Sequence, residues 1–232
     1  MSETWTIKTD NGGFNAYVAK PVGQGPWPAV VVIQEIFGVN HTMRQVADRL
    51  AADGFLAVAP DLFWRLEPGV DITDQTQAEW DRAFDLMNRF DLDKGVEDIA
   101  DVIEFVRARP ECSGKVGAVG YCLGGKLAFL TATRTDADAS VSYYGVGLDA
   151  HLGETETLAQ PLVLHIAEED GFSSAEARER IVGALGNNPQ VTIFTYPGRD
   201  HAFAREGGKN YDAADAALAN GRTLDFLNKH LK

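Results

Sequence analysis

The chain has 232 residues, 45% of them hydrophobic, which is enough to build the core of one α/β domain. It carries 21 lysine and arginine residues against 34 aspartate and glutamate residues, so the formal net charge is −13. Such an acidic balance argues against nucleic acid and anionic membrane surfaces as partners. No apolar run approaches the ~18 residues that a membrane span requires, and the N-terminus lacks a signal-peptide pattern.

The hydrophobic pattern alternates strands with helices along the chain. Period-two alternation predicts strands at 4–9 and 14–19, and a continuous apolar run predicts a buried strand at 29–34. Further strands are expected at 55–59, 116–121, 139–144, 162–167 and 192–196. Apolar residues three and four apart predict helices at 42–53, 75–89, 95–109, around 127–130, at 175–185 and at 213–231. A hairpin turn is expected at 10–13, and irregular segments at 23–28 and 145–160. This order predicts an α/β fold, a mostly parallel sheet with helices on both faces, in one domain spanning residues 1–232.

Two cysteines, Cys112 and Cys122, are expected on either side of the strand 116–121, with Cys112 in a loop. A strand length separates them, so a disulfide between them is not expected. Free thiols suit a reducing compartment, and the predicted location is the cytoplasm.

The most informative segment is Gly120-Tyr121-Cys122-Leu123-Gly124-Gly125, between an apolar strand and an apolar helix. This G-x-C-x-G-G pattern is typical of a nucleophile elbow, with cysteine where most elbows carry serine. The flanking glycines allow the strand and the helix to approach closely, and the dipole at the helix N-terminus favours the thiolate. The alternative is an ordinary buried cysteine beside a glycine-rich helix start.

A catalytic thiol needs a base, and five histidines are candidates. His201 is favoured because it follows the last predicted strand, and elbow hydrolases place their histidine last in chain order. His151, in an irregular segment, stays an alternative. His41, His165 and His230 are expected at a helix start, in the core and on a solvated helix.

The acid that orients the histidine is expected after the strand 162–167, where Glu168, Glu169 and Asp170 compete. Asp170 is favoured because its short side chain precedes Gly171 on a tight turn, while the two glutamates stay open as alternatives. Asp200 is rejected, because the side chains of neighbouring residues diverge.

With the elbow, Asp170 and His201 identified, the chain resembles the dienelactone hydrolase family nearly end to end. Further segments match family motifs, at 34–40, 60–62, 143–147 and 201–205. The resemblance implies the α/β-hydrolase fold and a catalytic triad of Cys122, His201 and Asp170.

The resemblance also implies further site residues. The oxyanion hole would use the backbone N–H groups of Leu123 and Ile36, and Glu35 would control the charge of the resting thiol. The implied substrate-binding residues are Arg205, Trp80, Phe37, Phe84 and Tyr144. On residue grounds alone, Arg205 could be a surface arginine and Glu35 a loop-capping carboxylate. No organic cofactor or metal is implied, since metal-ligand spacings such as H-E-x-x-H or C-x-x-C are absent from the sequence.

Two positions depart from the family pattern. Trp80 stands where dienelactone-cleaving members carry a second carboxylate-binding arginine, Arg82 is expected to point elsewhere, and Phe84 replaces a tyrosine. The resemblance implies a hydrolase of a small ester or lactone, with dienelactone (4-carboxymethylenebut-2-en-4-olide) cleaved to maleylacetate through a thioacyl-enzyme. The protein is expected to be a monomer. A broad-specificity esterase is the alternative. A non-catalytic thiol sensor is disfavoured, because it would need no acid-oriented histidine.

Overall fold

Eight β-strands form one sheet in this computed structural model, which describes residues 2–9 and 12–232. In chain order they are β1 (Ser2–Thr9), β2 (Gly12–Ala19), β3 (Trp27–Ile33), β4 (Leu56–Pro60), β5 (Cys112–Tyr121), β6 (Ala139–Tyr143), β7 (Leu162–Ala167) and β8 (Val191–Tyr196). The order across the sheet is β1-β2-β4-β3-β5-β6-β7-β8. β2 pairs antiparallel with both β1 and β4, and the strands β3 to β8 run parallel to one another, so the predicted mostly parallel sheet is confirmed.

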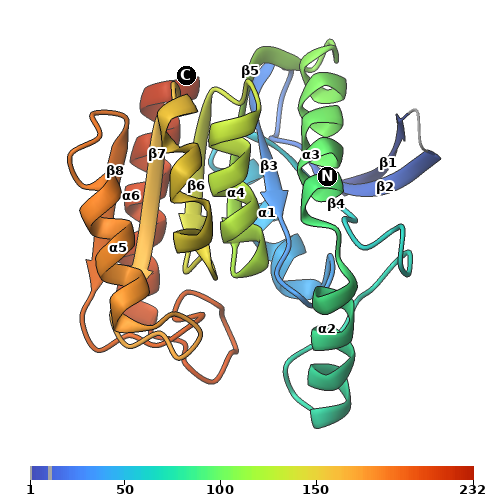
Figure 1. Cartoon of the computed structure of the whole chain (residues 1–232). Coiled ribbons are helices and arrows are strands. Elements are labelled where there is room, and N and C mark those ends of the chain that lie inside the picture. The colour runs from blue at the N-terminus through green and yellow to red at the C-terminus, as the bar shows by residue number, and fades with distance from the viewer. Residues whose placement is uncertain (1, 10–11) are drawn as a thin grey trace.

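Helices cover both faces of the sheet. They are α1 (His41–Ala52), α2 (Gln77–Arg89), α3 (Leu92–Arg107), α4 (Leu123–Arg134), α5 (Ala175–Leu185) and α6 (Ala213–Leu231), with the 3₁₀ helix η1 (Leu148–Thr157). α3, α4 and α5 lie on one face, and α1 and α6 lie on the other (Figure 1). α2 extends beyond the end of the sheet, on the side where β7 ends (Figure 1).

Short polar side chains begin most of these helices. Accepting side chains occupy the N-caps of five of them, at Asn40, Thr76, Asp91, Ser174 and Asp212. The helix α4 is different, because Cys122 is its N-cap and makes no side-chain capping bond within the described residues. The first-turn N–H groups of α4 therefore receive no capping oxygen from the residue at its N-cap.

Three segments differ from the sequence-based expectations. β3 begins at Trp27 rather than 29, and its pairing with β5 shifts register between Trp27 and Ala29, an irregularity that accommodates Pro28. Cys112 belongs to β5, paired with Trp27, rather than to a loop. Part of the segment expected to be irregular forms η1, which packs against α4 and α5 and gains order from those contacts.

The predicted hairpin is present, with Thr9 paired to Gly12 in an antiparallel register. Its expected turn residues Asp10 and Asn11 lie outside the described residues. The strands β3, β4 and β5 form the centre of the core, and most of their side chains are completely buried. Because parallel strands end at the same edge, the loops after β3, β5, β7 and β8 meet beside α2, and the candidate site lies there (Figure 1).

Candidate active site

Cys122 lies at the turn where the chain passes directly from β5 into α4. Its backbone has φ 57° and ψ −115°, a conformation that residues with side chains rarely adopt. A Cβ on Gly120 would lie 1.9 Å from the carbonyl oxygen of Gly124, and a Cβ on Gly124 would lie 2.3 Å from that of Ile33. The glycines are therefore required by close backbone contacts, as the elbow interpretation expects, and α4 starts directly against the end of β3.

His201 and Asp170 lie together on the loops after β8 and β7. The Nδ1 atom of His201 is 2.9 Å from Oδ2 of Asp170 and 3.1 Å from Oδ1, and the same ring lies within electrostatic reach of the Cys122 side chain. All three side chains are buried. Burial lowers the pKa of His201, but the Cys122 thiolate and the Asp170 carboxylate outweigh burial and raise it to about 10. The arrangement can hold a proton on the imidazole between two negatively charged groups.

Asp200, rejected as the triad acid, has a different place in the structure. Its Oδ1 atom accepts hydrogen bonds from the backbone N–H groups of His201, at 2.6 Å, and of Gly171, at 2.9 Å. Burial raises the pKa of Asp200, but these two N–H donors prevail and hold it below its usual value. Asp200 thus ties together the two loops that carry His201 and Asp170. Sequence reasoning missed this role, because it requires the two loops to be adjacent in space.

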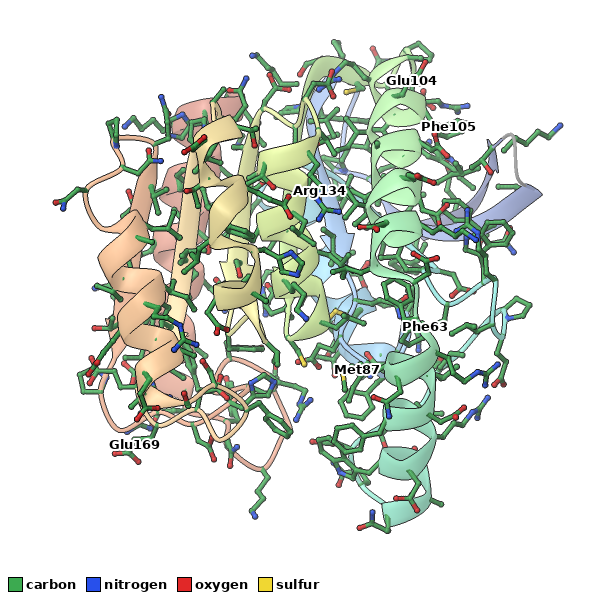
Figure 2. The ribbon with its side chains drawn as sticks, in the orientation of Figure 1. Phe63, Met87, Glu104, Phe105, Arg134 and Glu169 are labelled. Carbon is green, nitrogen blue, oxygen red and sulfur yellow. The ribbon has the colours of Figure 1, made fainter. Side chains whose placement is uncertain are left out.

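The structure separates Asp170 from the two competing glutamates. Asp170 is buried against His201, and it also accepts a hydrogen bond from the backbone N–H of Phe172 at 2.8 Å. Glu168 and Glu169 are exposed, and Glu169 lies at the outer edge of the loop after β7 (Figure 2). The other histidines are placed elsewhere.

The four other histidines lie in helices or in a strand. His41 and His230 lie in the end turns of α1 and α6. His165 is 1% exposed inside β7. His151 lies in η1, where its Nδ1 atom is 3.2 Å from Oε1 of Glu154. The alternative base His151 is therefore bonded to a different carboxylate.

The two expected oxyanion donors belong to segments in direct contact. Leu123 is the first residue of α4, and Ile36 follows β3 by three residues. A Cβ on Gly124 would lie 2.5 Å from the carbonyl oxygen of Gln34, so the start of α4 is packed against the segment that leads to Ile36. This packing brings both backbone segments to the side of the sheet where Cys122 lies. The arrangement is compatible with two backbone donors for a developing oxyanion.

Arg205 lies between two carboxylates. Its Nη1 atom donates to Oε2 of Glu35 at 3.2 Å, and its Nη2 atom is 3.0 Å from Oδ2 of Asp74. The three side chains are 10%, 1% and 11% exposed, respectively. Burial lowers the pKa of Arg205, but the two carboxylates raise it above its usual value. The second partner, Asp74, was not identified from the sequence, where no local pattern connects it to Arg205.

Aromatic side chains from three segments surround this pair of charges. Trp80 stacks on Phe84 with ring centroids 5.5 Å apart. Trp80 also packs edge-to-face with Phe37, with ring centroids 5.1 Å apart. Phe172, in the loop after β7, lies 6.4 Å from Phe84 and 4.8 Å from His201. Phe172 was also missed, since an exposed aromatic in a loop carries no periodic signal. Together these rings connect α2 to the catalytic histidine candidate.

The structure also places Arg82 and Tyr144. Arg82 pairs with Glu67 on the surface, where both side chains are exposed. Tyr144 has a φ of 38° and lies 5.1 Å from the His201 ring, and burial together with the charge of Glu35 raises its pKa well above the usual value. A non-glycine residue with positive φ beside the site indicates a locally strained backbone.

Comparison with known proteins identifies the family. Residues 14–231 match the model of the dienelactone hydrolase family. The chain belongs to this family. Membership makes the protein a hydrolase that acts on esters or lactones, with the α/β-hydrolase fold.

The similarity to individual relatives extends over whole chains. A protein of Azospirillum brasilense, provisionally named a carboxymethylenebutenolidase, is 53% identical, with 96% of each chain covered. The carboxymethylenebutenolidase of Pseudomonas putida is 41% identical over 98% of this chain and 96% of its own. A crystal structure from Klebsiella pneumoniae, provisionally named a dienelactone hydrolase, superposes with a TM-score of 0.87 at 26% identity, covering 99% of this chain and 98% of its own.

The described residues contain neither a candidate metal cluster nor a membrane-spanning helix. Within residues 2–9 and 12–232, no cluster of three or more histidine, cysteine, aspartate or glutamate side chains is arranged to hold a metal ion. Across the same residues, no helix is both long and apolar enough to cross a membrane.

Proposed function

We propose that Cys122 is the nucleophile with which this hydrolase cleaves its ester or lactone through a thioacyl-enzyme. His201 is the general acid and base, and Asp170 orients its ring. The observation that supports this most strongly is the buried pairing of His201 with Asp170 within electrostatic reach of Cys122, which lies at a strained strand-to-helix turn.

The reaction follows from these positions. The Cys122 thiolate attacks the carbonyl carbon, and the carbonyl π electrons move onto oxygen. The N–H groups of Leu123 and Ile36 stabilise this oxyanion, each contributing roughly 3 kcal/mol in comparable sites. Collapse of the intermediate breaks the bond to the leaving oxygen, which takes a proton from His201. In a lactone, the leaving oxygen stays attached to the acyl chain.

Water completes the cycle. His201, now neutral, removes a proton from water as that water attacks the thioester, and the Cys122 thiolate leaves as the carboxylic acid product forms. The imidazole returns to its protonated state beside the thiolate. No proton needs to leave the site in the acylation step, which suits a buried triad.

Two substrate classes are supported by different observations. The relatives' names and the buried Arg205 favour dienelactone, whose carboxylate would bind the guanidinium. The rings of Trp80 and Phe84, at positions where the family's dienelactone-cleaving members are expected to carry arginine and tyrosine, favour an uncharged activated ester.

The two free cysteines support a reducing, cytoplasmic location.

The test measures product release from 4-nitrophenyl acetate and from dienelactone. Many turnovers per protein molecule are expected, with a transient acyl-enzyme detected by mass spectrometry on the peptide that contains Cys122. Release of one equivalent without turnover would instead support the thiol-sensor interpretation. An acyl group found on another residue would overturn the assignment of Cys122.

A further inference from the structure

The guanidinium of Arg205 is already paired on both sides before any substrate arrives. The Nη1 atom of Arg205 is 3.2 Å from Oε2 of Glu35, and its Nη2 atom is 3.0 Å from Oδ2 of Asp74. Two carboxylates therefore share one positive charge in a nearly buried cluster. A substrate carboxylate would be the third anion at the same cation, and it would have to displace one of the two.

The position of Asp74 is set by several bonds. Its carbonyl oxygen accepts the indole N–H of Trp80 at 2.9 Å, and its Oδ1 atom accepts from the side chain of Gln75 at 2.6 Å. The preceding residue, Thr73, donates from its N–H and hydroxyl to Glu79, both at 2.8 Å. Asp74 is thus held beside Arg205 by the first turn of α2, so little conformational entropy is lost in forming this ion pair.

Trp80 contributes to the same arrangement in a second way. Its indole holds the backbone of Asp74, and its ring packs against Phe37, over which the Arg205 guanidinium lies at 5.2 Å. Where a second arginine was expected from the family pattern, this chain has a tryptophan that positions an acid against the remaining arginine. The substitution therefore removes one positive charge and helps to neutralise another.

We propose that Asp74 determines specificity by occupying Arg205 in place of a substrate carboxylate. Acting together with the apolar rings of Trp80, Phe84 and Phe172, it makes the site select uncharged acyl groups over carboxylate-bearing ones. The inference rests on the proposed function, because it places the acyl group of a Cys122 substrate against α2. Asp74 is the better candidate for displacement than Glu35, since it is 11% exposed and Glu35 is 1% exposed.

The test uses two esters that differ only at the end of the acyl chain. 4-Nitrophenyl hexanoate ends in a methyl group, and mono-4-nitrophenyl adipate ends in a carboxylate at the same position. For the unmodified protein, kcat/KM is expected to be higher for the hexanoate ester. In Asp74→Asn, the adipate-to-hexanoate ratio of kcat/KM should rise at least about tenfold, mostly through a lower KM for adipate.

A matched control separates local pairing from overall charge. Asp71→Asn removes the same charge from the same loop, but Asp71 pairs with Arg44 rather than Arg205. This variant should leave the adipate-to-hexanoate ratio within twofold of the unmodified protein, since long-range charge effects are screened. Asp74→Ser is a second test variant, and unfolding midpoints verify that each variant is folded.

The outcomes distinguish the two proposals. An active protein whose ratio is the same in Asp74→Asn, Asp74→Ser and Asp71→Asn would overturn the role of Asp74 and leave the hydrolase mechanism intact. A preference of the unmodified protein for the adipate ester would overturn it as well. A protein that turns over neither ester would contradict the proposed function itself.

Discussion

The two cysteines differ in what surrounds them. Cys122 lies at a strained turn within electrostatic reach of His201. Cys112 begins β5, where burial raises the pKa of its thiol. A buried thiol with a raised pKa is predominantly protonated at neutral pH and is a poor nucleophile.

Replacement of each cysteine by alanine should therefore have unequal effects. Cys122→Ala is expected to abolish ester hydrolysis, because loss of a triad nucleophile typically lowers kcat by a factor on the order of 10⁶. Cys112→Ala should keep nearly full activity. Initial rates on 4-nitrophenyl acetate measure both, and circular dichroism verifies folding. Equal loss of activity in two folded variants would contradict the assignment.

At the scale of elements, the contact between β3, β5 and α4 depends on residues without side chains. A Cβ on Gly124 would lie 2.3 Å from the carbonyl oxygen of Ile33 and 2.5 Å from that of Gln34. Both are backbone atoms of a central strand and its following loop, so they can move only if the sheet deforms. The same contact holds α4 at the angle that presents Cys122.

Gly124→Ala should accordingly destabilise the protein and lower its activity together. Overpacking of this kind costs on the order of 1–3 kcal/mol, and activity should fall further because Cys122 would shift. Gly221→Ala is the matched control, because nothing lies within 4 Å of a Cβ at this position in α6. That variant should be more stable by about 0.5–1 kcal/mol. Urea unfolding measures the stability of both variants, and equal stability of the two would contradict this prediction.

A second element-scale feature is the buried histidine of β7. Nδ1 of His165 is 2.7 Å from the hydroxyl of Tyr196, and Nε2 is 3.0 Å from the hydroxyl of Thr223. Burial, together with the nearby charge of Arg222, lowers the pKa of His165 to about 3. The ring therefore stays neutral in the folded protein, whereas it titrates with an ordinary pKa of 6.5 when unfolded.

This difference predicts a loss of stability in acid. Below pH 6.5 His165 binds a proton in the unfolded chain but stays neutral in the folded protein. The contribution of His165 to the free energy of unfolding therefore declines as pH falls from 6.5 toward 3. Between pH 7 and pH 5 the loss should be roughly 2 kcal/mol. The difference in unfolding free energy between the unmodified protein and His165→Gln, measured in urea at both pH values, should change by that amount. A difference independent of pH would show that His165 titrates normally.

At the scale of the whole molecule, the net charge of −13 acts on any charged substrate. An anionic ester is repelled during its approach, and this repulsion is screened by salt. Ion pairs such as that of Arg134 with Asp93 and Glu154 neutralise part of the positive charge on the helix surface. The remaining field is negative.

Salt should therefore affect the two esters differently. Raising NaCl from about 10 mM to about 200 mM should increase kcat/KM for mono-4-nitrophenyl adipate by roughly two- to fivefold. The value for 4-nitrophenyl hexanoate should stay constant, because an uncharged ester is not repelled. Steady-state kinetics at both salt concentrations, with potassium chloride as a second salt, measure the effect. A decrease for the adipate ester would mean that a local positive charge dominates its approach.

The sequence alone determined the features that depend on local pattern. Alternation of apolar runs predicted the parallel sheet, because buried strands and amphipathic helices have different periods. The glycines around Cys122 predicted the elbow, because only glycine fits such close backbone contacts. Chain order indicated His201, and turn chemistry favoured Asp170 without excluding Glu168 and Glu169.

Tertiary structure decided the features that depend on contacts between distant segments. Arg205 and Glu35 are 170 positions apart in the chain, and the pairing of Arg205 with Asp74 likewise joins separate loops. Asp200 bridges two loops, and Phe172 reaches across to α2. None of these contacts follows from hydrophobic period or turn propensity, because a charged or aromatic residue in a loop is compatible with many partners. The contact partner of such a loop residue is determined only when the folded sheet brings the ends of its strands together.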